Sequence, residues 1–126
     1  MPFGHSFHCD FETTDEYFGL LNDHLYLKEW IRTLIERIGM KIHVVDGKEA
    51  LLIDTWAGED APETFGTSIV GFLTTSSFSV HTTDNGILYL DIFSCRDFAP
   101  GDIIGTCMDY WGTGISMQNW RKVTRK

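Results

Sequence analysis

The chain has 126 residues, 43% of them hydrophobic, and a formal charge of −8 because 18 acidic residues outnumber 10 basic ones. This length predicts one domain spanning residues 1–126. The acidic balance argues against nucleic-acid binding, which needs a basic surface to replace phosphate counterions. No apolar run approaches the roughly 20 residues that cross a bilayer, so we expect no membrane segment.

Three cysteines, Cys9, Cys95 and Cys107, match no zinc spacing and are odd in number. Free thiols in a reducing compartment are the simplest interpretation. The first residues also lack the charged and apolar regions of a secretory signal. The sequence therefore predicts a cytoplasmic protein with free thiols and no metal site.

Apolar residues occupy alternate positions from residue 3 to residue 11, which is typical of a half-buried strand. His5 and His8 fall on opposite faces of that strand, so they cannot share a metal, and we expect both to be exposed or at a strand edge. From about residue 22 to residue 38 the apolar spacing is helical, and Gly39 is placed to end the helix.

Turn signals divide the rest of the chain. Asp46-Gly47 predicts a hairpin joining residues 40–45 to a returning strand at residues 51–56. Pro100 suits the first turn of a second helix. Further strands are expected at residues 67–73, 78–82, 87–95 and 115–123. Antiparallel hairpins with two helices predict an α+β fold, a two-layer α/β sandwich with both helices on one face of an antiparallel sheet.

The densest polar stretch is residues 74–83. Ser76 offers a hydroxyl and His81 a base, while Cys95 offers a thiol on the next predicted strand. Pairing across the Asp84-Asn85-Gly86 turn would place Cys95 near the start of the Ser76 strand. The same composition also fits a polar strand without catalytic chemistry, so spacing alone leaves both interpretations open.

The run Ser-Ser-Phe-Ser-Val-His-Thr at residues 76–82 resembles the processing segment of small prokaryotic S-adenosylmethionine decarboxylases. In that family a serine five residues before a histidine becomes a pyruvoyl group. Residues 90–95 resemble the family's apolar strand that ends in Asp-x-Phe-x-Cys, and residues 66–71 resemble the segment with a second processing serine. The resemblance covers nearly the whole chain, with matching length and element order.

The resemblance implies self-cleavage between Thr75 and Ser76, with Ser76 attacking the Thr75 carbonyl and becoming a pyruvoyl cofactor. It implies that His81 removes the α-proton of residue 76 and that Ser68 donates a hydrogen bond to the shifting carbonyl. The pyruvoyl ketone would form a Schiff base with the substrate amine and accept electrons as carbon dioxide leaves. Cys95 would then reprotonate the substrate carbon.

The implied activity is that of a carboxy-lyase, which decarboxylates S-adenosylmethionine and so supplies the aminopropyl donor for polyamine and spermidine synthesis. The family also implies a homodimer with active sites near the subunit interface. An acidic surface would favour the approach of a cationic sulfonium substrate.

The chain departs from the family pattern around the cut and after the histidine. The family has Glu-Ser-His at the cut, where this chain has Thr-Ser-Ser, and the family's Trp and Glu after His81 are missing in their usual form. Asp84 is a candidate replacement for the carboxylate, and Trp56 or Phe65 for the stacking ring. Two alternatives stay open: a pyruvoyl decarboxylase of arginine or ornithine, and a non-cleaving homologue that binds S-adenosylmethionine or a protein partner.

Overall fold

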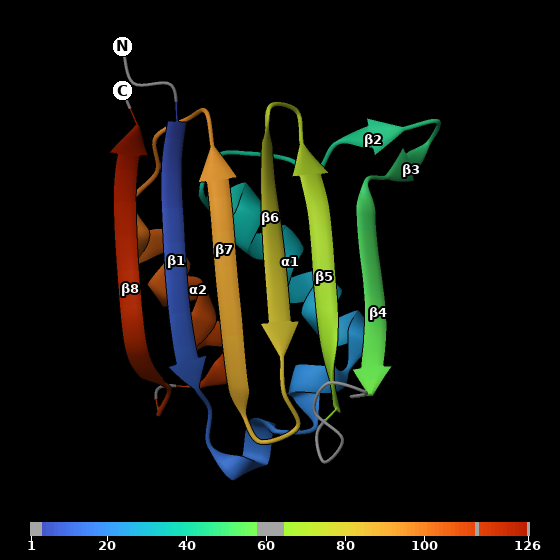
Figure 1. The fold of residues 1–126 in the computed structure, drawn as a ribbon, viewed down its shortest axis with the longest axis vertical. Coiled ribbons are helices and arrows are strands. Elements are labelled where there is room, and N and C mark those ends of the chain that lie inside the picture. Colours follow the sequence, from blue (N-terminus) through green and yellow to red (C-terminus); the bar gives the residue numbers. More distant parts are fainter. Residues whose placement is uncertain (1–3, 58–64, 113, 126) are drawn as a thin grey trace.

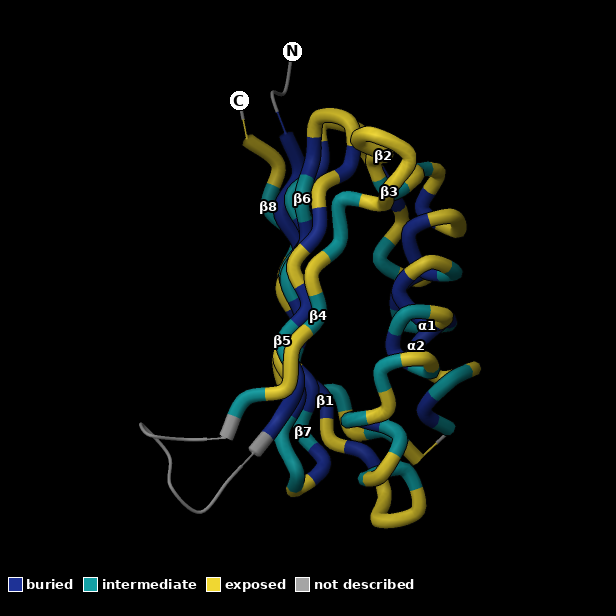
Figure 2. The backbone as a smooth tube through the Cα atoms, turned by 90° about the vertical axis from the view of Figure 1, so that its right-hand side faces the viewer, coloured by how far each residue is buried: buried dark blue, intermediate teal, exposed yellow. Residues whose placement is uncertain are grey.

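The computed structural model describes residues 4–57, 65–112 and 114–125. They form two layers, a six-stranded antiparallel sheet and two main helices that pack on one of its faces (Figure 1, Figure 2). The predicted α+β sandwich is therefore confirmed. The strands are β1 (Gly4–Glu12), β2 (Val44–Val45), β3 (Lys48–Glu49), β4 (Leu51–Ala57), β5 (Phe65–Leu73), β6 (Ser76–Thr82), β7 (Ile87–Ser94) and β8 (Ser116–Arg125). The helices are η1 (Asp15–Tyr17), η2 (Leu20–Asn22), α1 (His24–Arg37) and α2 (Pro100–Trp111).

The strand order is β4-β5-β6-β7-β1-β8, so the first strand of the chain lies between the last two of the large sheet. Phe7 of β1 is paired with Ile92 of β7 on one side and with Lys122 of β8 on the other. Strands β4 to β7 follow one another as hairpins. As a result, the start of β1, the start of β6 and the ends of β7 and β8 meet at one end of the sheet (Figure 1).

Helix α1 begins and ends with local signals that the sequence carries. The Asp23 side chain accepts the backbone N–H groups of Leu25 at 3.0 Å and Tyr26 at 3.1 Å, which caps the first turn. Gly39 follows the helix with a φ of 84°, a conformation that a residue with a Cβ rarely adopts. The buried face of α1 holds Leu27, Trp30, Ile31, Leu34 and Ile35.

Helix α2 starts at Pro100, as predicted, and packs beside α1. Trp111 of α2 and Trp30 of α1 are both fully buried and meet edge to face, with 5.8 Å between ring centroids. From the sheet, Phe11 also reaches the Trp111 ring. This aromatic cluster joins the two helices to the sheet in a single core.

The prediction for residues 40–56 is wrong in its pairing. Asp46 and Gly47 do form a hairpin turn, with φ values of 52° and 78°, but the strand that returns is β3 rather than residues 51–56. Strand β4 pairs with β5 instead, from Leu51↔Gly71 to Ala57↔Phe65. That ladder joins seven residue pairs, whereas β2 and β3 join two, so it satisfies more backbone groups.

The second face of the sheet has no layer over it among the described residues (Figure 2). Its apolar side chains are exposed to an unusual degree, among them Leu52 at 68%, Phe72 at 65%, Val70 at 46% and Tyr89 at 39%. We call this surface the open face. No helix in the described part of the chain is long and apolar enough to span a bilayer.

Candidate active site

The peptide bond between Thr75 and Ser76 lies at the end of the sheet where β1 starts. A turn at Thr74 and Thr75 connects β5 to β6, and Ser76 is the first residue of β6. Ser76 is 8% exposed, whereas Thr75 is exposed. A cut at this bond would therefore fall in a surface turn and leave the strand ladders intact.

Cys95 contacts both residues of that peptide. Its backbone N–H donates to Ser76 Oγ at 3.0 Å, and its thiol donates to the Thr75 carbonyl oxygen at 3.1 Å. The β6–β7 register, with Ser77 opposite Phe93, brings the residue after β7 beside the residue before β6. The predicted proximity of Cys95 to the start of the Ser76 strand is confirmed.

A cavity of about 370 Å³ adjoins the same peptide. Thr74, Thr75 and Ser76 form one side of it, and Lys41 and Arg96 line it as well. A small molecule or a water molecule thus has room next to residue 76. The two cationic side chains favour a ligand that presents negative charge on this side.

Ser68 and His81 form a second polar pair, on neighbouring strands. They are directly opposite one another in the β5–β6 register, and Ser68 Oγ lies 2.8 Å from His81 Nδ1. His81 is exposed on the open face. The hydrogen bond occupies Nδ1 and leaves Nε2 free to exchange a proton with a neighbouring molecule.

One chain does not bring His81 to Ser76. Successive side chains of a strand point to opposite faces, so residues five apart on β6 lie on opposite sides of the sheet. Along the strand they are separated by about 16 Å, from a rise of about 3.3 Å per residue. The expectation that His81 acts on residue 76 therefore requires a second copy of the chain. The spacing of five already carried this signal, because residues an odd number apart on a strand point to opposite faces.

The predicted substrate-binding residues lie toward the other end of the sheet from Ser76. Asp84 is in the turn that follows β6, and Trp56 is near the end of edge strand β4, opposite Gly66. Within one chain neither residue lies near Ser76 or Cys95. Both lie at the end of the sheet that carries Ser68 and His81. The side chain of Phe65 lies outside the described residues.

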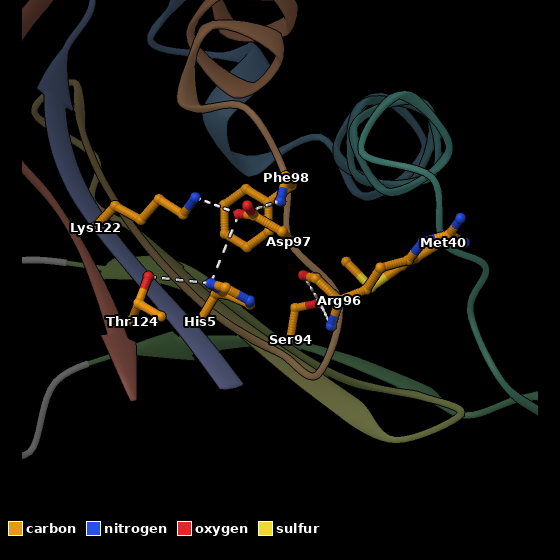
Figure 3. Close-up of polar contacts among 8 residues, drawn as sticks. All are labelled: His5, Met40, Ser94, Arg96, Asp97, Phe98, Lys122 and Thr124. Atoms are coloured by element: carbon orange, nitrogen blue, oxygen red, sulfur yellow. Dashed lines mark hydrogen bonds and ion pairs between the residues drawn. The ribbon is translucent and has the colours of Figure 1, made fainter. Parts of the chain in front are cut away.

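A third polar group surrounds the segment after Cys95, and the sequence analysis did not single it out (Figure 3). Asp97 Oδ1 accepts from the Lys122 ammonium and from the Phe98 backbone N–H at 2.8 Å. These two hydrogen bonds hold the pKa of the Asp97 carboxyl below its usual range. His5 lies 3.6 Å from the same oxygen and is 6% exposed, so the expectation that it is exposed or at an edge is wrong. Its side chain is on the same face of β1 as the core residues Phe7 and Cys9, and β8 pairs beyond β1, so His5 is neither exposed nor at an edge.

Comparison with known proteins identifies the family and the fold. A protein-family model described as S-adenosylmethionine decarboxylase matches residues 7–122. The chain belongs to the S-adenosylmethionine decarboxylase family. The crystal structure of the adenosylmethionine decarboxylase from Aquifex aeolicus superposes with a TM-score of 0.66 at 13% identity, covering 98% of this chain and 91% of that one. At this identity the superposition establishes the shared fold. No curated protein sequence matches the chain significantly.

Within this family member, the described residues include no group of three or more His, Cys, Asp and Glu side chains placed to hold a metal ion. The groups that the structure gathers around residue 76 are a hydroxyl, a thiol and the backbone amide of Cys95. They can hold a carbonyl, orient an attacking oxygen and transfer a proton.

Proposed function

We propose that this family member cuts itself between Thr75 and Ser76 and then decarboxylates S-adenosylmethionine, supplying the aminopropyl donor for polyamine synthesis. The observation that carries the proposal is the double contact of Cys95 with the peptide to be cut: its thiol lies on the Thr75 carbonyl and its amide on the Ser76 hydroxyl. A structural cysteine at the surface would need neither contact.

The contacts match the first step of self-cleavage. Ser76 Oγ attacks the carbonyl carbon of Thr75 and the bond from that carbon to the Ser76 nitrogen breaks, which leaves an ester. The Cys95 thiol donates to the carbonyl oxygen that gains negative charge in this step. The Cys95 amide fixes the attacking oxygen from a second direction.

Removal of the α-proton of residue 76 then breaks the ester, because the Thr75 carboxylate leaves from Cβ. Water replaces the nitrogen of residue 76 and ammonia is released, so that residue 76 ends as a pyruvoyl group. Such a group supplies a ketone that binds a substrate amine and accepts the electrons left by carbon dioxide. Position 76 fits it, since the residue starts a strand beside a cavity of about 370 Å³.

After cleavage, the same Cys95 is positioned to return a proton. It is the only exposed cysteine, because Cys9 and Cys107 are buried. Burial raises the pKa of Cys107 to about 12 and also raises the pKa of Cys9, so both stay protonated and inaccessible. Cys95 is therefore the thiol that can exchange a proton with a ligand at residue 76.

The proton-removing base is proposed to come from a second copy of the chain. His81 lies on the open face, at the end of the sheet opposite Ser76, and its Nδ1 is hydrogen-bonded to Ser68 Oγ. Strands β6 and β7 are the middle strands of the large sheet. If two copies pack by their open faces about a two-fold axis perpendicular to the strands, the His81 end of one sheet lies over the end of the other sheet at which β6 begins. Because the Ser76 side chain is on the helix face, His81 of the second copy would reach residue 76 from the exposed turn at Thr74 and Thr75.

The chemistry of the open face supports this homodimer. Leu52, Val70 and Phe72 expose apolar surface to water, and burying that surface against a second copy would lower the free energy. Two polar pairs on this face, His8 with Asp91 and Ser68 with His81, form within the chain. These pairs can be covered by a second copy while they keep their hydrogen bonds.

Intact-mass measurement of the purified full chain tests the function. The expected result is two fragments, residues 1–75 and 76–126, whose summed mass reflects one water gained and one ammonia lost, and no fragments from Ser76→Ala. A single full-length mass after long incubation would exclude the enzyme and leave the non-cleaving homologue. Carbon dioxide release from S-adenosylmethionine, arginine and ornithine then identifies the substrate among the candidates.

A further inference from the structure

The segment that carries Cys95 joins β7 to α2 and belongs to neither element. The residues before and after Cys95 are hydrogen-bonded to each other: Ser94 Oγ accepts the Arg96 backbone N–H at 2.9 Å and donates to the Arg96 carbonyl at 2.6 Å. Arg96 Nη1 donates to the Gly39 carbonyl at 3.1 Å, which attaches the segment to the end of α1. Beyond these contacts, the segment depends on Asp97 and Phe98.

Asp97 connects the segment to β1 and β8, the two strands at one edge of the sheet (Figure 3). Its carboxylate faces Lys122 of β8 and lies 3.6 Å from His5 of β1. The Lys122 ammonium also lies 5.3 Å from the centre of the Phe98 ring. Phe98 itself is 7% exposed and packs edge to face against Phe7.

This cluster contributes little to holding the sheet together. Strands β1 and β8 are already joined by an antiparallel ladder, which runs unbroken from Gly4 to Asp10 and has one register shift between Asp10 and Phe11. Asp97 is 68% exposed, and an exposed ion pair adds little to stability because the side chains must be ordered. The Asp97–Lys122 contact instead positions the loop between β7 and α2. Asp97 is two residues after Cys95 in this loop, and without the contact its side chain would point into solvent.

We propose that Asp97, held by Lys122 and His5, is a positioning residue for Cys95. It keeps the thiol on the Thr75 carbonyl and the amide on the Ser76 hydroxyl. The catalytic meaning of this positioning depends on the proposed function, but the positioning itself is a property of the uncleaved chain and can be measured there.

The rate at which iodoacetamide alkylates Cys95 reports how firmly the thiol is held on the Thr75 carbonyl. Peptide mass mapping identifies the modified residue. The full chain is used, kept whole by His81→Ala if it cleaves. Asp97→Asn and Lys122→Met remove charges of opposite sign, and each removes the same ion pair. Loss of positioning frees the thiol in both, and we expect both to react about threefold to fivefold faster, the effect of an exposed ion pair worth up to about 1 kcal/mol.

Lys122→Arg, which can keep the ion pair, should react at close to the original rate. The matched control is Asp109→Asn, which removes the exposed Arg37–Asp109 pair between α1 and α2 and should leave Cys95 unchanged. If the charges acted on the thiol only through the electric field, Asp97→Asn and Lys122→Met would shift the rate in opposite directions. Opposite shifts, or no shift in either variant, would overturn the proposal.

Self-cleavage separates this inference from the proposed function. In chains that cleave, Asp97→Asn should slow cleavage by a similar factor, because the Cys95 amide leaves Ser76 Oγ. A normal cleavage rate in that variant would overturn the proposal. If the unmodified chain never cleaves, the proposed function fails, while the alkylation rates still decide whether Asp97 positions Cys95.

Discussion

The backbone N–H of Cys95 donates to Ser76 Oγ at 3.0 Å, while the Cys95 side chain makes a separate contact with Thr75. The amide and the thiol therefore act on different atoms. A substitution of the side chain removes one contact and keeps the other, so the two contributions of this residue can be measured apart.

Cys95→Ala should slow self-cleavage only modestly, because alanine keeps the backbone amide on Ser76 Oγ and the thiol that is lost from the Thr75 carbonyl is a weak hydrogen-bond donor. Decarboxylation should fall by about 10²-fold to 10⁴-fold, the usual contribution of a proton donor. Fragment formation by mass spectrometry and carbon dioxide release measure the two steps. An equal loss of both would show that the thiol is needed for cleavage as well.

Mixing two inactive variants should restore cleavage if His81 acts from the second copy. We expect Ser76→Ala and His81→Ala each to stay whole alone. Co-expressed in equal amounts, about half of the His81→Ala chains should be cut, because random pairing places half of them beside a partner with an intact His81. The Ser76→Ala chains should stay whole. Fragments from neither chain would indicate that the base does not come from the partner.

Phe72→Asp should weaken self-association, because it places a charge in the open face. The side chain is 65% exposed in one chain, so the fold should persist. Leu25→Asp is the control, since Leu25 is 80% exposed but lies on α1. Light scattering after size-exclusion chromatography reports the mass, and circular dichroism reports the fold. An unchanged dimer in Phe72→Asp would place the interface elsewhere.

Trp111→Ala should lower the free energy of unfolding by about 3–5 kcal/mol, since it empties the centre of the aromatic cluster that joins both helices to the sheet. Leu25→Ala should change it by no more than about 0.5 kcal/mol, because that side chain is exposed. Urea unfolding followed by circular dichroism compares the two. Similar losses in both variants would mean that the cluster is not the core.

Iodoacetamide should modify Cys95 alone in the folded chain, and Cys9 and Cys107 only after unfolding. Burial raises the pKa of Cys107 from 9.0 to about 12, so between about pH 9 and 12 the unfolded chain loses a thiol proton that the folded chain keeps. The free energy of unfolding should therefore fall as the pH rises through this window. Cys107→Ala should make that fall shallower, and an identical slope would count against the buried thiol as its cause.

Much of the local structure could be predicted from the sequence because its causes are local. The alternation around Phe7, the helical spacing before Gly39 and the proline at residue 100 each determine an element from neighbouring residues. The nearness of Ser76 and Cys95 was also predictable, since a hairpin fixes which residues face each other. By contrast, the pairing of residues 51–57 with β5 depends on a competition between partners that no local pattern reveals.

The sequence by itself determined which groups are available for chemistry: Ser76 before a strand, Cys95 one hairpin away, and Ser68 and His81 on two consecutive strands. Only the tertiary structure decided where those groups act. Both helices cover the same face, which leaves His81 on an open surface away from Ser76, and β8 joins β1 at the far side of the sheet. That last pairing brings two residues to Asp97: Lys122, which lies 25 residues after it in the chain, and His5, which lies 92 residues before it. Side-chain periodicity carries no information over either separation.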